Sequence, residues 1–316
     1  MEQIEGRTAF ITGGASGIGL GMAKAFTKAG MNVVVADLRD DHIDQARAWF
    51  DETNRKGQAH FLKLDVTDRE AYAAAADEAE RVFGKVHVLC NNAGIGISSE
   101  VSKASYKDWD WGIDVNLTGV FNGVHVMLPR IRSHGEGGHI VNTASMGGIL
   151  QYSRSGVYVT TKFAVVGLSE ALRFELEGEP IGVSAFCPGG VRTNIREWEK
   201  TRPERFTDAG DADGKAPGGP PPGWRMDEEV MKTLGEMSWE PEDVGEMVLE
   251  GIRTDSLYIF TSPEFRPGIQ ERFEAILAAT GDNPELAKKA RLHVPNLVSS
   301  PIYMSSVARR KAPKKS

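Results

Sequence analysis

Short runs rich in β-branched residues alternate with longer helical patterns over the first 190 residues, and this alternation constrains the fold most. The runs span residues 8–12, 32–36, 60–64, 86–90, 139–143 and 182–186, and the helical patterns span 17–29, 41–56, 69–83, 109–133 and 156–178. Such alternation is typical of βαβ crossovers, which build a parallel sheet covered by helices on both faces. We therefore expect an α/β fold with a doubly wound parallel sheet.

The pattern breaks over residues 194–240, which include five Pro or Gly residues in a row at 218–222. No regular element can contain that run, and loops this long are often lids or binding loops. Regular secondary structure is predicted again after residue 240: a helix at 241–253, a last strand at 257–261 and helices at 266–279 and 285–292. We expect one domain over 1–308 with a substrate lid at 194–240 and a helical extension at 262–294. Residues 309–316, RRKAPKKS, are expected to be a flexible basic tail, with a weak nucleic-acid or membrane contact as the alternative.

Composition narrows the class of protein further. The net charge is −7, which argues against general nucleic-acid binding because that requires a basic face. Cys90 and Cys187 each end an apolar run, so they are expected to be buried, reduced thiols. The N-terminus has no secretory signal, and no run approaches the ~18 apolar residues that span a membrane. We expect a cytoplasmic protein without a membrane partner.

Residues 12–19 read TGGASGIG and join the first expected strand to the first expected helix. Glycines there permit a tight turn close to a phosphate, and the helix N-terminus offers free N–H groups to a pyrophosphate. Asp37 ends the second strand, where its carboxylate can bind the ribose diol of NAD and repel the 2′-phosphate of NADP. Ser16 supports NAD because it adds no positive charge, whereas the nearby Arg39 could contact a 2′-phosphate.

Together with the glycine spacing, the sequences NNAG at 91–94 and YVTTK at 158–162 resemble the short-chain dehydrogenase/reductase family. The resemblance covers about residues 5–260 and implies a Rossmann-type sheet of about seven strands, a nicotinamide cofactor and chemistry at an alcohol or carbonyl. The C-terminal part resembles a lengthened bacterial subgroup that includes Cα-dehydrogenases of lignin-type β-aryl ethers. The expected cofactor-binding residues are Gly13, Ser16, Gly17, Ile18, Gly19, Asp37, Asp65, Val66, Asn92, Ala93, Gly94, Tyr158, Lys162, Pro188, Gly189, Val191 and Thr193.

Four residues are expected to be catalytic. Tyr158 and Lys162 lie four apart on one helix face, so the ammonium can lower the tyrosine pKa and make it a base. Ser145 ends the fifth strand and can donate a hydrogen bond to the substrate oxygen. For Asn116 the resemblance implies a water that links Lys162 to solvent, the alternative being an amide satisfied by backbone groups alone.

The expected lid is rich in aromatic residues and methionine, which favours a bulky, apolar secondary alcohol such as an aryl, terpenoid or steroid alcohol. Its large side chains are Trp198, Phe206, Trp224, Met226, Met231, Met237 and Trp239; alternatively they only pack the lid onto the sheet. The residues Ile97, Met146, Gly147, Ile149 and Tyr152 could line the pocket floor. Only Arg154 and Arg196 are candidates to bind a substrate carboxylate.

Two other classes compete with an NAD-dependent dehydrogenase. One is a non-catalytic nicotinamide-binding regulator, although all four expected catalytic residues are present. The other is a nucleotide-sugar epimerase or dehydratase, against which the glycine spacing and the single domain argue. The seven histidines form no metal pattern, and Asp110 and Asp114 are expected on an exposed helix surface, so no catalytic metal is expected. The family resemblance implies a homotetramer or homodimer, and the apolar helices at 109–133 and 156–178 agree with it.

Overall fold

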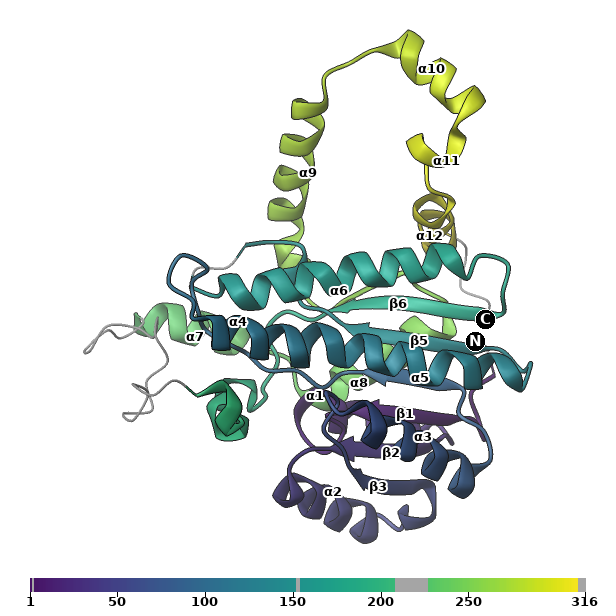
Figure 1. Cartoon of the computed structure of the whole chain (residues 1–316), viewed down its shortest axis with the longest axis vertical. Helices are drawn as coiled ribbons and strands as arrows, with labels where there is room; N and C mark the ends of the chain where they lie inside the picture. Colours follow the sequence, from purple (N-terminus) through teal and green to yellow (C-terminus); the bar gives the residue numbers. More distant parts are fainter. Residues whose placement is uncertain (2, 152–153, 208–226, 312–316) are drawn as a thin grey trace.

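The computed structural model describes residues 1, 3–151, 154–207 and 227–311, and it contains a single parallel sheet (Figure 1). The seven strands lie in the order β3-β2-β1-β4-β5-β6-β7. They are β1 (Thr8–Thr12), β2 (Asn32–Asp37), β3 (Ala59–Lys63), β4 (Val88–Asn91), β5 (Gly138–Thr143), β6 (Ile181–Cys187) and β7 (Tyr258–Phe260). All six pairings are parallel, which confirms the expected Rossmann-type α/β sheet.

Helices cover both faces of the sheet. The helices are α1 (Gly17–Lys28), α2 (Asp40–Glu52), α3 (Arg69–Phe83), α4 (Tyr106–Ile113), α5 (Gly119–Ser133), α6 (Gly156–Glu175), α7 (Glu228–Glu236), α8 (Pro241–Arg253), α9 (Arg266–Thr280), α10 (Pro284–His293), α11 (Pro295–Val298) and α12 (Pro301–Lys311). One core lies between the sheet and α1, α2 and α8, and the other between the sheet and α3, α5 and α6. The central strands are apolar at successive positions because both of their faces are buried.

Successive strands are added outward in one direction from β1 to β3 and in the opposite direction from β4 to β7, so the strand order reverses between β1 and β4. Both β1 and β4 continue into loops at the carboxyl ends of the strands. Open α/β sheets bind ligands at such a switch point, beyond the carboxyl ends of the strands. The turn after β1 and the segment after β4 therefore lie side by side, and Asn92 donates from its side chain to the carbonyls of Thr12 and Gly13 (3.2 Å each).

The expected helix at 109–133 is helical along its whole length, but it is not one regular α-helix. A π-helical turn, Asp114–Thr118, separates α4 from α5. Such turns disturb the regular ladder and are frequent at functional sites. Here the turn places the Asn116 side chain in the interior, where it is fully buried.

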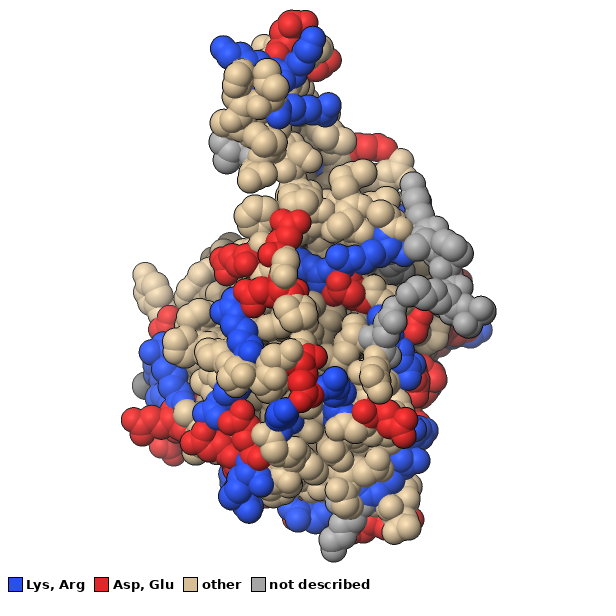
Figure 2. Space-filling model, turned by 90° about the vertical axis from the view of Figure 1, so that its right-hand side faces the viewer, with Lys and Arg blue, Asp and Glu red and all other residues tan. Residues whose placement is uncertain are grey.

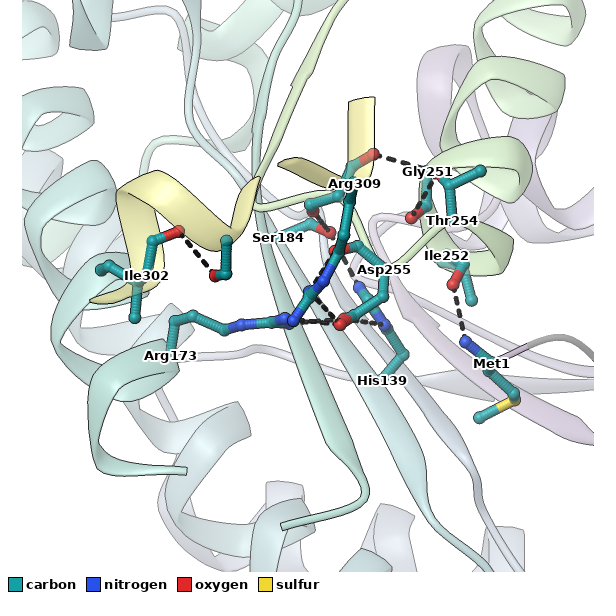
Figure 3. A network of polar contacts seen from close by, with 12 residues as sticks. Met1, His139, Arg173, Ser184, Gly251, Ile252, Thr254, Asp255, Ile302 and Arg309 are labelled. Atoms are coloured by element: carbon teal, nitrogen blue, oxygen red, sulfur yellow. Dashed lines mark hydrogen bonds and ion pairs between the residues drawn. The ribbon is translucent and has the colours of Figure 1, made fainter. Parts of the chain in front are cut away.

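The expectation of a flexible tail from residue 309 onward is wrong for residues 309–311. The helix α12 includes them, Ile302 buries its side chain and Arg309 forms an ion pair with Asp255 (Figure 3). Residues 312–316 lie outside the described residues. The helix forms there because Pro301 starts it and a buried apolar contact and an acidic partner hold its two ends.

Both cysteines are free and buried, as expected. Within the described ranges, no helix combines the length and hydropathy that crossing a membrane requires. The Pro and Gly run at 218–222 lies outside the described part of the chain. The rest of the expected lid contains short 3-10 helices, Ile195–Thr201 and Glu204–Phe206, followed by α7.

Candidate active site

The turn after β1 packs so closely that side chains are excluded. Gly13 has a φ of 58°, and a Cβ there would lie 2.9 Å from the Cα of Ala93. Gly17, which begins α1, has a φ of 49°, and its Cβ would lie 3.0 Å from Cγ2 of Thr193. Because the Ser16 side chain makes no cap hydrogen bond, the first N–H groups of α1 remain available. The turn thus fits a phosphate group.

Asp37 occupies the end of β2 and is 7% exposed. Its carboxylate accepts hydrogen bonds from the backbone N–H groups of Ala15 and Arg39, both at 3.1 Å. These bonds fix the carboxylate at the mouth of a cavity that Ser16, Asp37 and Arg39 line. The Arg39 guanidinium turns to Asp41, to which Nε (3.0 Å) and Nη2 (2.5 Å) both donate.

The cavity extends from Asp37 past Gly94 to the side chains of Tyr158 and Lys162 and has a volume of about 220 Å³. Fourteen of the expected cofactor-binding residues line it: Gly13, Ser16, Gly17, Ile18, Asp37, Asp65, Val66, Asn92, Ala93, Gly94, Tyr158, Lys162, Pro188 and Thr193. Gly19, Gly189 and Val191 do not. A Cβ on Gly19 would lie 2.0 Å from the carbonyl oxygen of Gly13, and a Cβ on Gly189 would lie 2.0 Å from Oγ of Ser262. These two glycines permit close packing behind the cavity.

Tyr158 lies in the first turn of α6 and faces Ser145, which follows β5. Burial raises the pKa of Tyr158, and the hydrogen bond with Ser145 opposes that rise. The Ser145 hydroxyl also accepts from the N–H of Gly147 (3.0 Å), which fixes its position. Withdrawal of the phenol from water is the largest influence on this pKa, and the lowering expected from Lys162 stays a prediction.

Lys162 is 3% exposed, and its ammonium lies 5.6 Å from the centre of the Tyr158 ring. It donates to the carbonyl oxygen of Thr143 (2.9 Å). Burial lowers the pKa of Lys162 to about 8. A charged amine therefore stands beside the phenol at neutral pH, but at a cost in desolvation.

Asn116 bonds the loop that follows β4. Its Oδ1 accepts from the N–H of Ile95 (2.8 Å), and its Nδ2 donates to the Ile95 carbonyl (3.0 Å) and to Oγ1 of Thr161 (3.2 Å). The buried amide is thus satisfied partly by backbone groups and partly by the Thr161 hydroxyl, so the alternative of backbone partners alone does not hold as stated. A role in holding a water near Lys162 stays a prediction.

An aromatic wall closes the substrate end of the cavity. Trp198 and Phe206 of the expected lid pack against Trp111 of α4, with ring centres 5.5 and 6.4 Å from it. Trp111 and Trp198 also line the cavity, so this part of the lid both packs and shapes the pocket. Trp224 and Met226 lie outside the described residues, as does the side chain of Met231.

The expected pocket floor needs correction. The cavity is lined by Ile95 and Val115, whereas Ile97, Met146 and Ile149 are buried behind it, and Gly147 is also absent from its lining. Tyr152 falls outside the described residues. Arg154 does not line the cavity and lies 4.0 Å from Glu100, and nothing can be said of the Arg196 side chain.

Sequence reasoning missed an ion pair that holds the aromatic wall in place. Arg202 pairs with the fully buried Asp108, and its guanidinium lies 5.0 Å from the Trp111 ring and 5.7 Å from the Trp198 ring. The partners are 94 positions apart and belong to no motif. The aromatic and charged composition of 198–206 is the one signal that could have indicated this contact.

The fold also gathers His87, His134 and Glu136, which the sequence spacing does not indicate. The nitrogen atoms that could bind a metal already have hydrogen-bond partners. Nδ1 of His87 accepts from the Thr8 N–H, and the two ring nitrogens of His134 contact the Val86 carbonyl and the Glu136 N–H. Arg7 and Lys85 pair with Glu136 and supply positive charge. This group is a structural cluster, and we propose no metal site there.

Comparisons with known proteins agree with this geometry. A family model described as short chain dehydrogenase matches residues 7–203. The C alpha-dehydrogenase of a Sphingobium species is 38% identical over 297 residues, which cover 92% of each chain. The 3beta-hydroxysteroid dehydrogenase 2 of Eggerthella lenta is 35% identical over 194 residues, or 61% of this chain and 74% of that one. A short chain dehydrogenase/reductase of Burkholderia phymatum, solved in complex with NAD, is 30% identical with a TM-score of 0.76, covering 90% of this chain and 98% of its own. The chain therefore belongs to the short chain dehydrogenase family.

Proposed function

We propose that this oxidoreductase transfers a hydride between a secondary alcohol and NAD. The observation that carries the proposal is the placement of Tyr158 and Lys162 at one end of a cavity whose other end holds Asp37, with Ser145 hydrogen-bonded to Tyr158 from just outside the lining. When bound, NAD supplies the hydride acceptor, and the protein supplies the base and the positioning. The glycine turn fits the pyrophosphate, since any side chain at Gly13 would collide with Ala93.

The four side chains divide the proton chemistry. The Ser145 hydroxyl donates to the alcohol oxygen and orients it, and the ionised Tyr158 oxygen takes the hydroxyl proton as the C–H bond breaks. The Lys162 ammonium stabilises the phenolate that must form first. Asn116 holds the Ile95 loop against the base of the site through its paired amide bonds.

The preference for NAD over NADP rests on two carboxylates. Asp37 is fixed by the Ala15 and Arg39 amides and would repel a 2′-phosphate. Asp41 binds one edge of the Arg39 guanidinium through both carboxylate oxygens, which weakens that arginine as a phosphate ligand. The Burkholderia neighbour, solved with NAD, supports the same choice.

The substrate is bulky and largely apolar, because Trp111, Trp198, Ile95 and Val115 line its end of the cavity. The relatives named C alpha-dehydrogenase and 3beta-hydroxysteroid dehydrogenase support an aryl or steroid alcohol over a small one. Among the described residues, the Arg and Lys side chains that line the cavity are Arg39, Lys162 and Arg205. Of these three, Arg205 belongs to the lid. We also propose a homodimer or homotetramer, located in the cytoplasm, where buried thiols stay reduced.

A panel of aryl, terpenoid, steroid and short-chain alcohols, assayed with NAD and with NADP, tests the proposal. We expect turnover of bulky alcohols with NAD, and a shift of the kcat/KM ratio toward NADP in Asp37→Ala.

Tyr158→Phe should lower kcat by about 10²–10⁴-fold while cofactor binding, measured by calorimetry, is kept. Tight cofactor binding without turnover of any alcohol would instead indicate a nicotinamide-binding regulator. A wild-type preference for NADP would overturn the cofactor assignment.

A further inference from the structure

A helical arm, comprising α9, α10 and α11 over residues 266–298, projects from the body (Figure 1). Neither α9 nor α10 has a single buried residue. Helices of this length draw most of their stability from packing an apolar face, and within the described chain only Ile269, near the start of α9, packs against a core cluster. Figure 2 shows the same feature as a column that stands clear of the body.

The arm exposes an unusual number of large apolar side chains. Seven of the twenty-one exposed large hydrophobic residues of the described chain lie on it: Phe273, Ile276, Leu277, Leu286, Leu292, Val294 and Val298. Leu292 is 76% exposed and Leu277 is 68% exposed. Contiguous exposure of this kind marks an interaction surface.

Both ends of the arm are anchored, so it projects in a fixed direction. At its start, the Arg272 guanidinium lies over the ring of Phe163 on α6 (5.0 Å). Beyond its end, α12 returns to the body, where Tyr303 donates to Glu170 of α6 (2.8 Å) and Arg309 pairs with Asp255. The arm therefore forms an arch over α6, because α9 at its start and α12 beyond its end both contact that helix (Figure 1).

Exposed charges of opposite sign lie on α10 and at the carboxyl end of α6. On α10, Lys288, Lys289 and Arg291 are exposed, and within the described residues they form no ion pair. The carboxyl end of α6 exposes Phe174 (41%), beside Glu175 and, just beyond the helix, Glu177. Each surface thus combines an apolar patch with exposed charge, basic on α10 and acidic at the end of α6.

We propose that the arm docks onto a second copy of this chain, with α10 of each copy on the Phe174–Glu177 end of α6 in the other. The contact is reciprocal, as a two-fold dimer requires, because each chain carries both surfaces. The proposal rests on the homo-oligomer proposed above, but not on the reaction assigned to the active site.

Charge exchange tests the contact. Sedimentation over a dilution series compares the wild type with Lys288→Glu/Lys289→Glu, with Glu175→Lys/Glu177→Lys, and with all four changes in one chain. Each double variant should weaken self-association by about tenfold or more, and the fourfold variant should restore much of it. The matched control, Lys103→Glu/Lys232→Glu, makes the same charge change on exposed lysines of α7 and the loop before α4, and should associate like the wild type.

A mixed disulfide locates the contact. When Leu292→Cys and Phe174→Cys chains of different tag length are mixed and oxidised, we expect a crosslink between unlike chains, because Cys90 and Cys187 are buried. Double variants that associate as tightly as the wild type, a monomeric wild type, or the absence of the mixed crosslink would each overturn the proposal. Circular dichroism checks folding, and kcat measured in parallel separates failure of the interface from failure of the proposed reaction.

Discussion

Lys162 shows how a residue can serve the reaction at the expense of the fold. Its ammonium is 3% exposed and has the Thr143 carbonyl as a partner at 2.9 Å. Burial lowers its pKa to about 8 from the ordinary value of 10.5, so the folded protein disfavours the charged form. The sequence identified this residue by its spacing from Tyr158, but spacing cannot show how deeply the amine is buried.

Lys162→Met should abolish nearly all turnover and yet stabilise the cofactor-free protein at pH 7. Each unit of pKa shift corresponds to about 1.4 kcal/mol, and the Thr143 carbonyl loses its partner, so we expect a net gain of roughly 1–2 kcal/mol. The unfolded lysine binds more protons than the folded one between pH 8 and 10.5, so wild-type stability rises with pH in that window. The gain should therefore be largest below pH 8 and shrink toward pH 10.5. Urea unfolding at several pH values measures it, and a destabilised variant at pH 7 would contradict this account.

Among the elements, α1 and α8 approach each other through two glycines. A Cβ on Gly21 of α1 would lie 1.9 Å from the Pro241 carbonyl oxygen, and a Cβ on Gly245 of α8 would lie 2.3 Å from the Gly21 carbonyl oxygen. Backbone therefore packs against backbone, and this contact helps to fix α1 and the glycine turn that precedes it.

Gly21→Ala should destabilise the protein by about 1–3 kcal/mol, because the new methyl group collides with backbone rather than with a flexible side chain. The matched control is Gly167→Ala on α6, where nothing lies within 4 Å of the added carbon. Alanine there should stabilise the helix by up to about 1 kcal/mol. Denaturant unfolding compares the two, and equal effects would show that the contact between α1 and α8 relaxes freely.

Element boundaries were predictable where the chain carries an explicit end signal. The helices α3 and α8 were predicted to the residue: Asp68 caps α3 by accepting from the Glu70 and Ala71 N–H groups, and Pro241 begins α8. The π-helical turn at Asp114–Thr118 was missed, because the apolar pattern continues through it and no residue type marks it. The helix α12 was missed because its composition is basic and its stability comes from a distant contact to Asp255.

The candidate site was predictable for a topological reason. Residues that follow β1, β2, β4 and β5 meet at one edge of a parallel sheet, so motifs far apart in sequence had to converge. The aromatic wall was predicted only as a composition. Its packing depends on the Asp108–Arg202 pair, and no local pattern relates those two positions.

For the molecule as a whole, the carboxyl ends and the amino ends of the strands carry different features. The carboxyl edge holds the cavity, and the amino edge of β5 and β6 holds a polar network around Asp255 (Figure 3). Arg173 of α6 and Arg309 of α12 both pair with Asp255, and Nδ1 of His139 lies 3.9 Å from it. The network joins the sheet to the C-terminal helix at the edge opposite Tyr158, so stability there should be separable from turnover.

Asp255→Asn tests that separation. Asp255 has a φ of 49°, which asparagine tolerates, so the substitution removes the charge without straining the backbone. Burial raises the pKa of Asp255, but the hydrogen bonds and charge of Arg173 outweigh this and hold it below its ordinary value. The carboxylate therefore stabilises the fold at neutral pH, and that contribution is lost as pH falls from about 4 through the lowered pKa.

At pH 7 we expect Asp255→Asn to lose about 1–3 kcal/mol of stability, below the usual figure for a fully buried pair because the side chain is 31% exposed. Arg309→Gln, at a more exposed position, should lose less than about 1 kcal/mol. Urea unfolding at pH 7 and below pH 4 measures the loss, and kcat for both variants should equal that of the wild type; a fall in kcat that parallels the loss of stability would show that the two edges of the sheet are coupled.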